Sequence, residues 1–157
     1  MVRRCWPLAL IPVLLLAGCS SGPRPPSLAR VGQTIPFTNT KGQSMNLTVL
    51  GSGTATTLVP LGGERLYVIR LRIANTSGAE LVTDPLLYFS VEVGGGTSYT
   101  ATFDPLNGCA LIGGSGSANI PPGASAGGCV GFVIPSGATV TRVVAGSAGQ
   151  TPGEWRI

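Results

Sequence analysis

Ser125 has the most recognisable arrangement for covalent chemistry, because it lies between Gly123 and Gly127 in a G-x-S-x-G pattern. In hydrolases with this pattern, the serine attacks a carbonyl carbon after a histidine has taken its proton. The chain has no histidine, and its only lysine, Lys41, is distant in the sequence. The segment also follows two prolines and precedes a strand-like run, whereas a nucleophile elbow joins a strand to a helix. We therefore expect no catalytic role for Ser125.

The carboxylates are the next candidates, since paired acids hydrolyse glycosides and clustered acids bind calcium. The six acids stand singly, mostly at the ends of predicted strands: Glu64, Glu80, Asp84, Glu92, Asp104 and Glu154. Both aspartates precede a proline, which is typical of a turn. Separate acids indicate a solvated surface, so we expect neither an enzyme nor a metal or cofactor site. A hydrolase that uses scattered carboxylates is the weaker alternative.

Cys19 has the clearest chemistry of the four cysteines, because it ends the sequence Leu16-Ala17-Gly18-Cys19 after two arginines and an apolar run. This arrangement resembles the lipobox of bacterial lipoproteins, in which the cysteine thiol is joined to a diacylglycerol group before a peptidase cuts in front of it. The apolar run is shorter than the roughly 20 residues that span a bilayer. We therefore predict a lipoprotein signal peptide over residues 1–18 and lipidation of Cys19. A plain signal peptide is the alternative.

Removal of residues 1–18 would change the charge balance and leave a tether. The formal charge of the whole chain is +4, and the loss of Arg3 and Arg4 lowers it by two. The basic balance therefore does not indicate nucleic-acid binding.

The serines and prolines of residues 19–30 predict an extended tether, and residues 31–157 are long enough for one domain. We expect the domain to face the periplasm or the exterior, lipid-anchored to the cell membrane or the outer membrane.

Cys109 and Cys129 form the pair that is left once Cys5 is removed with the signal and Cys19 carries lipid. In an exported chain, such a pair favours a disulfide. A metal site is the alternative, but two thiolates without histidine need carboxylates to complete the usual four-ligand shell. The two cysteines are only 20 positions apart and no tryptophan lies between them. We expect a local clamp, unlike the bridge between sheets in antibody domains.

The sequence of the domain predicts short strands separated by turns of glycine, proline, asparagine and serine. In the clearest strand, at 64–77, apolar residues alternate with Val68, Arg70 and Arg72, as in a half-buried antiparallel strand. Residues 86–93 repeat the alternation. Other predicted strands lie at 33–38, 45–51, 97–103, 128–135, 139–146 and 154–157. About eight short strands in one domain predict an all-β antiparallel sandwich.

Four segments resemble a family of bacterial lipoprotein domains of unknown function, similar to a secreted mycobacterial immunoprotective antigen. They are VGQTIPF at 31–37, RLYVIRLRIANTSG at 65–78, PPGASAGGCVGFVIPSG at 121–137 and EWRI at 154–157. The resemblance implies an immunoglobulin-like β-sandwich over residues 31–157. It implies no activity, because sandwiches of this kind carry many different functions.

Arg70 and Arg72, with Tyr88 on a neighbouring strand, are the candidate interaction surface. The alternative is that they are ordinary outward positions, which are polar in any sandwich. The loops at Gly94–Gly96 and Gly113–Gly116 are further candidates, since binding residues often lie in loops.

We expect a non-catalytic binding or protein-interaction module at the cell envelope. It would be held to the membrane by lipid on Cys19, with another envelope protein or a surface ligand as its partner. The alternative is a structural accessory that stabilises an envelope complex without a ligand of its own.

Overall fold

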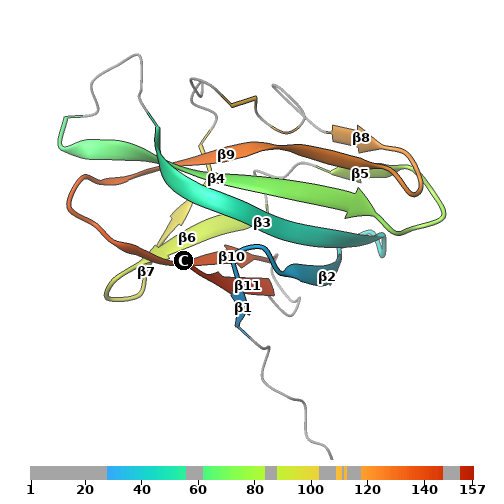
Figure 1. Cartoon of the computed structure of the whole chain (residues 1–157), viewed down its shortest axis with the longest axis horizontal. Helices are drawn as coiled ribbons and strands as arrows, with labels where there is room; N and C mark the ends of the chain where they lie inside the picture. Colours follow the sequence, from blue (N-terminus) through green and yellow to red (C-terminus); the bar gives the residue numbers. More distant parts are fainter. Residues whose placement is uncertain are drawn as a thin grey trace, which may run out of the picture.

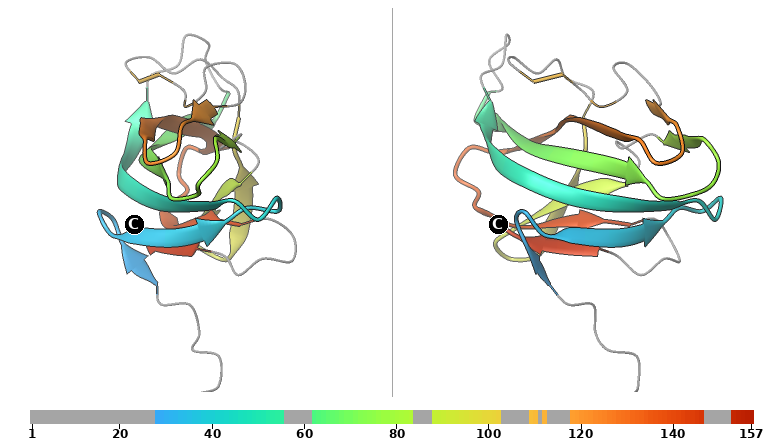
Figure 2. Two further views of the ribbon diagram at one scale, coloured as in Figure 1. Left: turned by 90° about the vertical axis from the view of Figure 1, so that its right-hand side faces the viewer. Right: turned by 45° about the vertical axis from the view of Figure 1, so that its right-hand side comes forward.

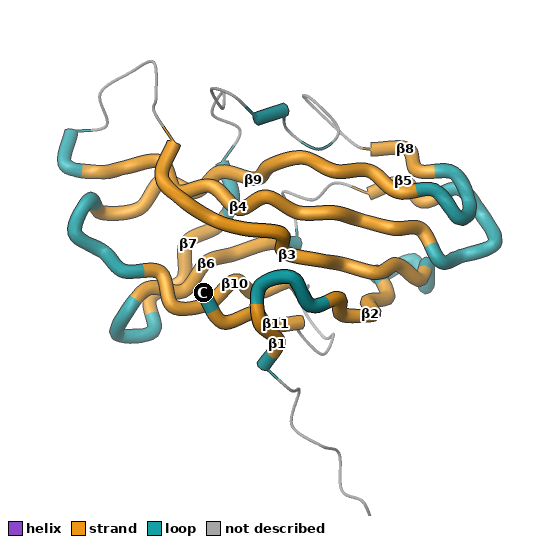
Figure 3. Tube along the Cα trace, in the orientation of Figure 1, coloured by secondary structure: helices purple, strands orange, loops and turns teal. Residues whose placement is uncertain are grey.

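Two β-sheets packed face to face make up the body of the protein, with a small third sheet at one end (Figure 1). The computed structural model describes residues 28–55, 62–83, 88–102, 109–110, 112, 118–146 and 153–157. In these ranges strands are joined by loops and turns (Figure 3). No helix long and apolar enough to cross a membrane occurs among them.

The described strands are β1 (Ala29–Arg30), β2 (Thr34–Thr38), β3 (Ser44–Ala55), β4 (Glu64–Asn75), β5 (Leu81–Thr83), β6 (Phe89–Val93), β7 (Thr97–Thr100), β8 (Ala118–Ile120), β9 (Ser125–Pro135), β10 (Val140–Ala145) and β11 (Gly153–Arg156). The five-stranded sheet has the order β1-β11-β10-β6-β7, and the four-stranded sheet has the order β2-β3-β4-β9. β5 and β8 pair separately. Apart from the parallel pair β1–β11, the described strand pairs are antiparallel, so the predicted sandwich is confirmed.

β4 lies in the middle of the four-stranded sheet and follows the alternation that the sequence predicted. Its buried side chains Tyr67, Ile69, Leu71 and Ile73 face the other sheet, and the arginines between them are exposed. β3 and β9 flank β4 on either side. The alternation therefore decides which side chains of β4 fill the core and which face solvent.

The core lies between the two sheets. Val91, Val143 and Trp155 enter it from the five-stranded sheet, and Ile69 and Phe132 enter it from the four-stranded sheet. Trp155 is fully buried, and its indole Nε1–H donates to the carbonyl of Gln33 at 2.9 Å. The polar atom of the largest core side chain is therefore satisfied.

The sandwich begins earlier than predicted, because Ala29 and Arg30 belong to β1 and not to the tether. β1 pairs with β11, which brings Ala29 beside Trp155 and Arg30 beside Arg156. Ala29 is buried in the core. The physical reason is that β1 hydrogen-bonds to the outer edge of β11 and buries a side chain, which a solvated tether does not do. The boundary between residues 18 and 19 lies outside the described residues.

A tight turn then carries the chain from the five-stranded sheet to the four-stranded sheet. Gly32 adopts a φ of 90° there, a conformation that favours glycine. Its amide donates to the carbonyl of Val49 on β3 at 2.7 Å, and the amide of Gln33 donates to the carbonyl of Arg30 at 3.0 Å. The first turn of the domain therefore joins both sheets.

Candidate functional site

Cys19, the predicted lipidation site, lies outside the described residues, as does the predicted loop Gly113–Gly116. The described chain starts at Leu28, directly before β1. β1 lies at the edge of the five-stranded sheet, and the C mark is close to it in both views of Figure 2. The start and the end of the domain therefore meet on one side of the sandwich.

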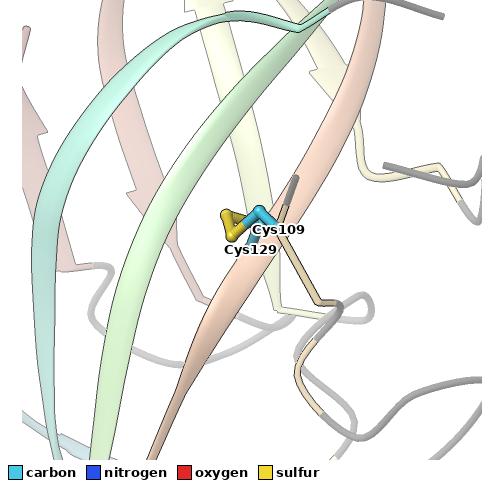
Figure 4. The surroundings of a disulfide bond; sticks show 2 residues. All are labelled: Cys109 and Cys129. Carbon is cyan, nitrogen blue, oxygen red and sulfur yellow. A yellow bond between two sulfur atoms is a disulfide. The ribbon is translucent and has the colours of Figure 1, made fainter. Parts of the chain in front are cut away.

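Cys109 and Cys129 are joined by the predicted disulfide, with their Cα atoms 5.9 Å apart (Figure 4). Cys129 lies on β9 and pairs in register with Arg70, so its side chain is on the outward face of the four-stranded sheet. The amide of Cys129 also donates to the carbonyl of Ala110 at 2.9 Å. The bridge is thus a local clamp between β9 and the segment beside it.

The clamp covers the free edge of β9, which is the last strand of the four-stranded sheet. Among the described residues, two backbone hydrogen bonds reach this edge: Cys129 N–H to the Ala110 carbonyl, and Thr102 N–H to the Gly131 carbonyl at 2.8 Å. An uncovered edge strand would present unpaired backbone groups to other chains. The disulfide therefore holds in place a segment that blocks such pairing.

Tyr88 does not join the two arginines, so the expectation that it lies on a strand next to β4 is wrong. It directly precedes β6, which belongs to the other sheet. Its ring packs edge to face against Phe37, with the ring centroids 6.1 Å apart. The physical reason is that alternation reveals the face of a strand on which a residue lies, but not the neighbouring strand.

Arg70 and Arg72 lie on the outward face of the four-stranded sheet, as predicted. Arg72 Nε donates to Ser125 Oγ at 3.3 Å, so the serine of the G-x-S-x-G pattern is a partner of an arginine on a strand. Glycines flank both arginines: Gly51 is the cross-strand neighbour of Arg70, and Gly127 that of Arg72. The other cross-strand neighbours are Cys129 for Arg70 and Thr48 for Arg72. Each arginine therefore has one side without a neighbouring side chain.

Gly51 owes its outward position to a bulge in β3. The register between β3 and β4 shifts between Val49 and Gly51, so Leu50 has no direct partner on β4 and is 49% exposed. A Cβ atom added to Gly51 would have open space around it. Packing inside the domain therefore does not require glycine at this position, and a glycine inside a strand often marks a bulge, as it does here.

Two of the described acids, Glu92 and Glu154, are partners of an arginine. Arg142 on β10 lies between them: its Nε is 3.8 Å from Glu92 Oε2, and its Nη1 is 3.3 Å from Glu154 Oε2. No group of three or more potential metal-ligating side chains occurs in the described part of the chain. Asp84 and Asp104 lie outside that part.

Three arginines form a row across the outward face of the five-stranded sheet, which we call the arginine row: Arg30, Arg156 and Arg142. Arg30 pairs with Arg156 across β1 and β11, and Arg156 pairs with Arg142 across β11 and β10. Their sequence neighbours Ala29, Trp155 and Val143 are buried, so the arginines face outward. Like charges directly opposite one another destabilise a sheet, and the two described ion pairs of the row both belong to Arg142.

A groove of about 550 Å³ adjoins the arginine row. Arg142 and Arg156 supply cationic side chains, Glu92 supplies an acidic one, and Leu28, Val140 and Ile157 supply apolar ones. The turn Gly94–Gly96, a predicted loop candidate, forms another part of its wall. The groove therefore lies where the described chain begins.

Arg30 and Arg156 were not recognised as candidate residues from the sequence. The sequence offers only a local indication of their position. Each arginine directly follows an apolar residue that is buried in the core, Ala29 before Arg30 and Trp155 before Arg156. These two positions are 126 residues apart, and only the parallel pairing of β1 with β11 brings them together.

Asn75, the last residue of β4, has a structural role. It is 2% exposed, and its Nδ2 donates to the carbonyls of Ala79 and Ile120 at 2.8 Å each. Its Oδ1 accepts from the amide and the hydroxyl of Ser77. This asparagine therefore holds the end of β4 against the β8–β9 connection.

No protein-family model matches the chain, and no curated protein matches it in sequence. Solved structures do match the fold. The secreted protein MPT63 of Mycobacterium tuberculosis is 18% identical with a TM-score of 0.66, and the match covers 84% of this chain and 98% of MPT63. The predicted similarity to a secreted mycobacterial sandwich is therefore confirmed.

Two further structures share the sandwich. A putative lipoprotein, ycdA, of Bacillus subtilis is 13% identical with a TM-score of 0.57, over 82% of this chain and 38% of that chain. A β-sandwich protein of Clostridium difficile 630 is 16% identical with a TM-score of 0.51, over 84% of this chain and 95% of that chain. At these identities the matches establish the fold.

Proposed function

We propose that the protein is an exported lipoprotein whose β-sandwich acts as a non-catalytic interaction module at the cell envelope. The observation that carries the proposal is the sequence Leu16-Ala17-Gly18-Cys19, which a short Ser/Pro-rich segment separates from β1. A cysteine that carries a diacylglycerol group and is then acylated further anchors a protein stably, because stable anchoring requires two lipid signals.

The location receives support from two other observations. The disulfide Cys109–Cys129 suits an oxidising compartment outside the cytoplasm. Two proteins that share the fold are described as secreted and as a putative lipoprotein. Together they favour an extracytoplasmic site of action.

The non-catalytic role is supported by the chemistry of the side chains. The chain has no histidine to act as a base. The serine of the nucleophile-like pattern is a hydrogen-bond partner of Arg72, and Glu92 and Glu154 are ion-paired with Arg142. These groups are used in structural contacts.

We assign partner binding to the outward face of the four-stranded sheet around Arg70 and Arg72. Gly51 and Gly127 leave the backbone beside these arginines accessible. Guanidinium groups recognise carboxylates and other anionic groups through paired hydrogen bonds. An acidic surface on another envelope protein fits this arrangement.

Metabolic labelling with a radioactive fatty acid tests the anchor. We expect label in the wild-type protein and none in Cys19→Ala. Cys5→Ala is the matched control, since it removes a cysteine from the predicted signal and should keep the label. Label that persists in Cys19→Ala would contradict the anchor.

Affinity capture from the native envelope tests the interaction face. Arg70→Glu with Arg72→Glu should lose a partner that the wild-type protein retains. Lys41→Glu, a charge reversal in the exposed turn between β2 and β3, is the control and should retain it. If both variants lose the partner equally, binding depends on the overall charge of the domain and not on this face.

A further inference from the structure

The arginine row carries more positive charge than the described acids neutralise. Arg142 lies between Glu92 and Glu154, whereas Arg30 and Arg156 have no ion pair with a described acid. Cross-strand pairing places these two arginines next to each other on adjacent strands. Like charges opposite each other on adjacent strands destabilise a sheet, so an anionic partner would reduce the repulsion between the two arginines.

Two exposed apolar residues are sequence neighbours of the arginine row. Val31 directly follows Arg30 and is 38% exposed, and Ile157 directly follows Arg156 and is 39% exposed. Ile157 and Leu28 line the groove beside the row. Exposed apolar side chains beside cationic ones are typical of surfaces that contact the headgroup region of a bilayer.

The position of the row relative to the predicted anchor is restricted by the length of the chain. Cys19 is followed by eight residues before Leu28, and even a fully extended segment of this size reaches at most about 30 Å. Arg30 is the second residue of β1, the first strand after this segment. A lipid on Cys19 would therefore keep the arginine row within reach of the bilayer surface.

We propose that the arginine row and its groove bind the anionic phospholipid headgroups of the membrane that holds the lipid anchor. This inference rests on the anchor proposed above. A guanidinium group matches a phosphodiester through paired charge-assisted hydrogen bonds. Arg30 and Arg156 bind the headgroups, while Val31 and Ile157 lie at the boundary with the acyl chains.

The proposal sets the orientation of the domain. The arginine row lies on the outward face of the five-stranded sheet, and Arg70 and Arg72 lie on the outward face of the four-stranded sheet. Since the two sheets pack face to face, these outward faces are opposite (Figure 1). Binding of the row to lipid would therefore direct Arg70 and Arg72 away from the membrane.

Hydrogen–deuterium exchange of the acylated protein in lipid nanodiscs tests the proposal. Discs of phosphatidylcholine are compared with discs that also contain phosphatidylglycerol, and peptides are followed that cover Gly94–Gly96 and Gly153–Ile157. We expect several-fold slower exchange of these peptides on the anionic discs. Added salt should reduce the difference, because it screens the attraction.

Paired substitutions locate the effect. Arg30→Gln with Arg156→Gln should abolish the slowing, while Arg70→Gln with Arg72→Gln removes the same charge from the opposite face and should keep it. Melting temperatures equal to that of the wild-type protein would show that neither double substitution unfolds the domain. Equal loss of slowing in both, or equal exchange on both kinds of disc, would overturn the proposal.

Two further outcomes separate the alternatives. If the protein does not enter nanodiscs at all, the anchor fails, and with it the proposed lipoprotein on which this inference rests. If the protein enters them but excess inorganic phosphate on neutral discs slows the same peptides equally, the groove is a site for free anions. That result would overturn headgroup binding and leave the anchor unaffected.

Discussion

Gly128 on β9 lies directly against Ile112: a Cβ atom added to the glycine would come within 2.6 Å of Ile112 Cγ1. The carbonyl oxygen of Ala110 and the amide nitrogen of Ile112 would be 2.7 and 2.9 Å away. Ile112 is itself buried in the core. The missing side chain at Gly128 therefore allows the disulfide-linked segment to pack against β9.

Gly128→Ala is expected to destabilise the domain by about 1–3 kcal/mol, as other over-packed positions do. Backbone atoms contribute two of the three close contacts, so a side-chain rotation cannot relieve them. Urea unfolding measures the change. Gly127→Ala is the control, because its nearest contact would be an ordinary 3.7 Å to the Leu71 carbonyl. Equal destabilisation of both variants would refute the close-packing argument.

Cys109→Ser is expected to lower the free energy of unfolding by about 3 kcal/mol, the chain-entropy value for a loop of roughly 20 residues. The melting temperature should fall by several degrees, and Cys129 should react with a thiol reagent. Reduction of the wild-type protein should reproduce the lower melting temperature. Two reactive thiols in the unreduced wild-type domain would show that the bridge is absent in solution.

Asn75→Ala is expected to cost about 2–3 kcal/mol, because it leaves buried backbone groups without partners. The side chain is bonded to Ala79, Ile120 and Ser77. Asn46→Ala, at a half-buried outward position of β3, should change stability by less than about 0.5 kcal/mol. Thermal unfolding compares the two, and a similar loss at Asn46 would argue against the role given to Asn75.

Residues 24–157, exported without lipid, should fold with the melting temperature of the full domain, because every described strand lies within them. We expect this form to fail to restore an envelope phenotype that deletion of the protein produces. Attachment to a surface raises the effective concentration of the domain near its partners. Full rescue by the soluble form at native abundance would contradict a role that depends on the anchor.

The alternation of apolar and polar residues determined the β-sandwich and the faces of its strands. In 64–77 it predicted that Tyr67 and Ile69 are buried and that Arg70 is exposed, as the structure has them. This prediction succeeds because successive side chains of a strand point to opposite faces, whichever strands lie beside it. The pairing of Cys109 with Cys129 followed from the cysteine count in an exported chain.

Short strands and turns were harder to predict. β1 has two residues and β5 and β8 have three each, too few for alternation to be recognised. Ala29 was therefore assigned to the tether, although it is buried beside Trp155.

Only the tertiary structure decided which strands are neighbours. It separated Tyr88 from Arg70 into different sheets, and it brought Arg30, Arg156 and Arg142 from three strands into one row. The physical reason is that strand pairing depends on backbone hydrogen bonds between distant segments, which are chemically similar at every position. Local patterns specify the face of each residue, and the packing of the whole core selects its neighbours.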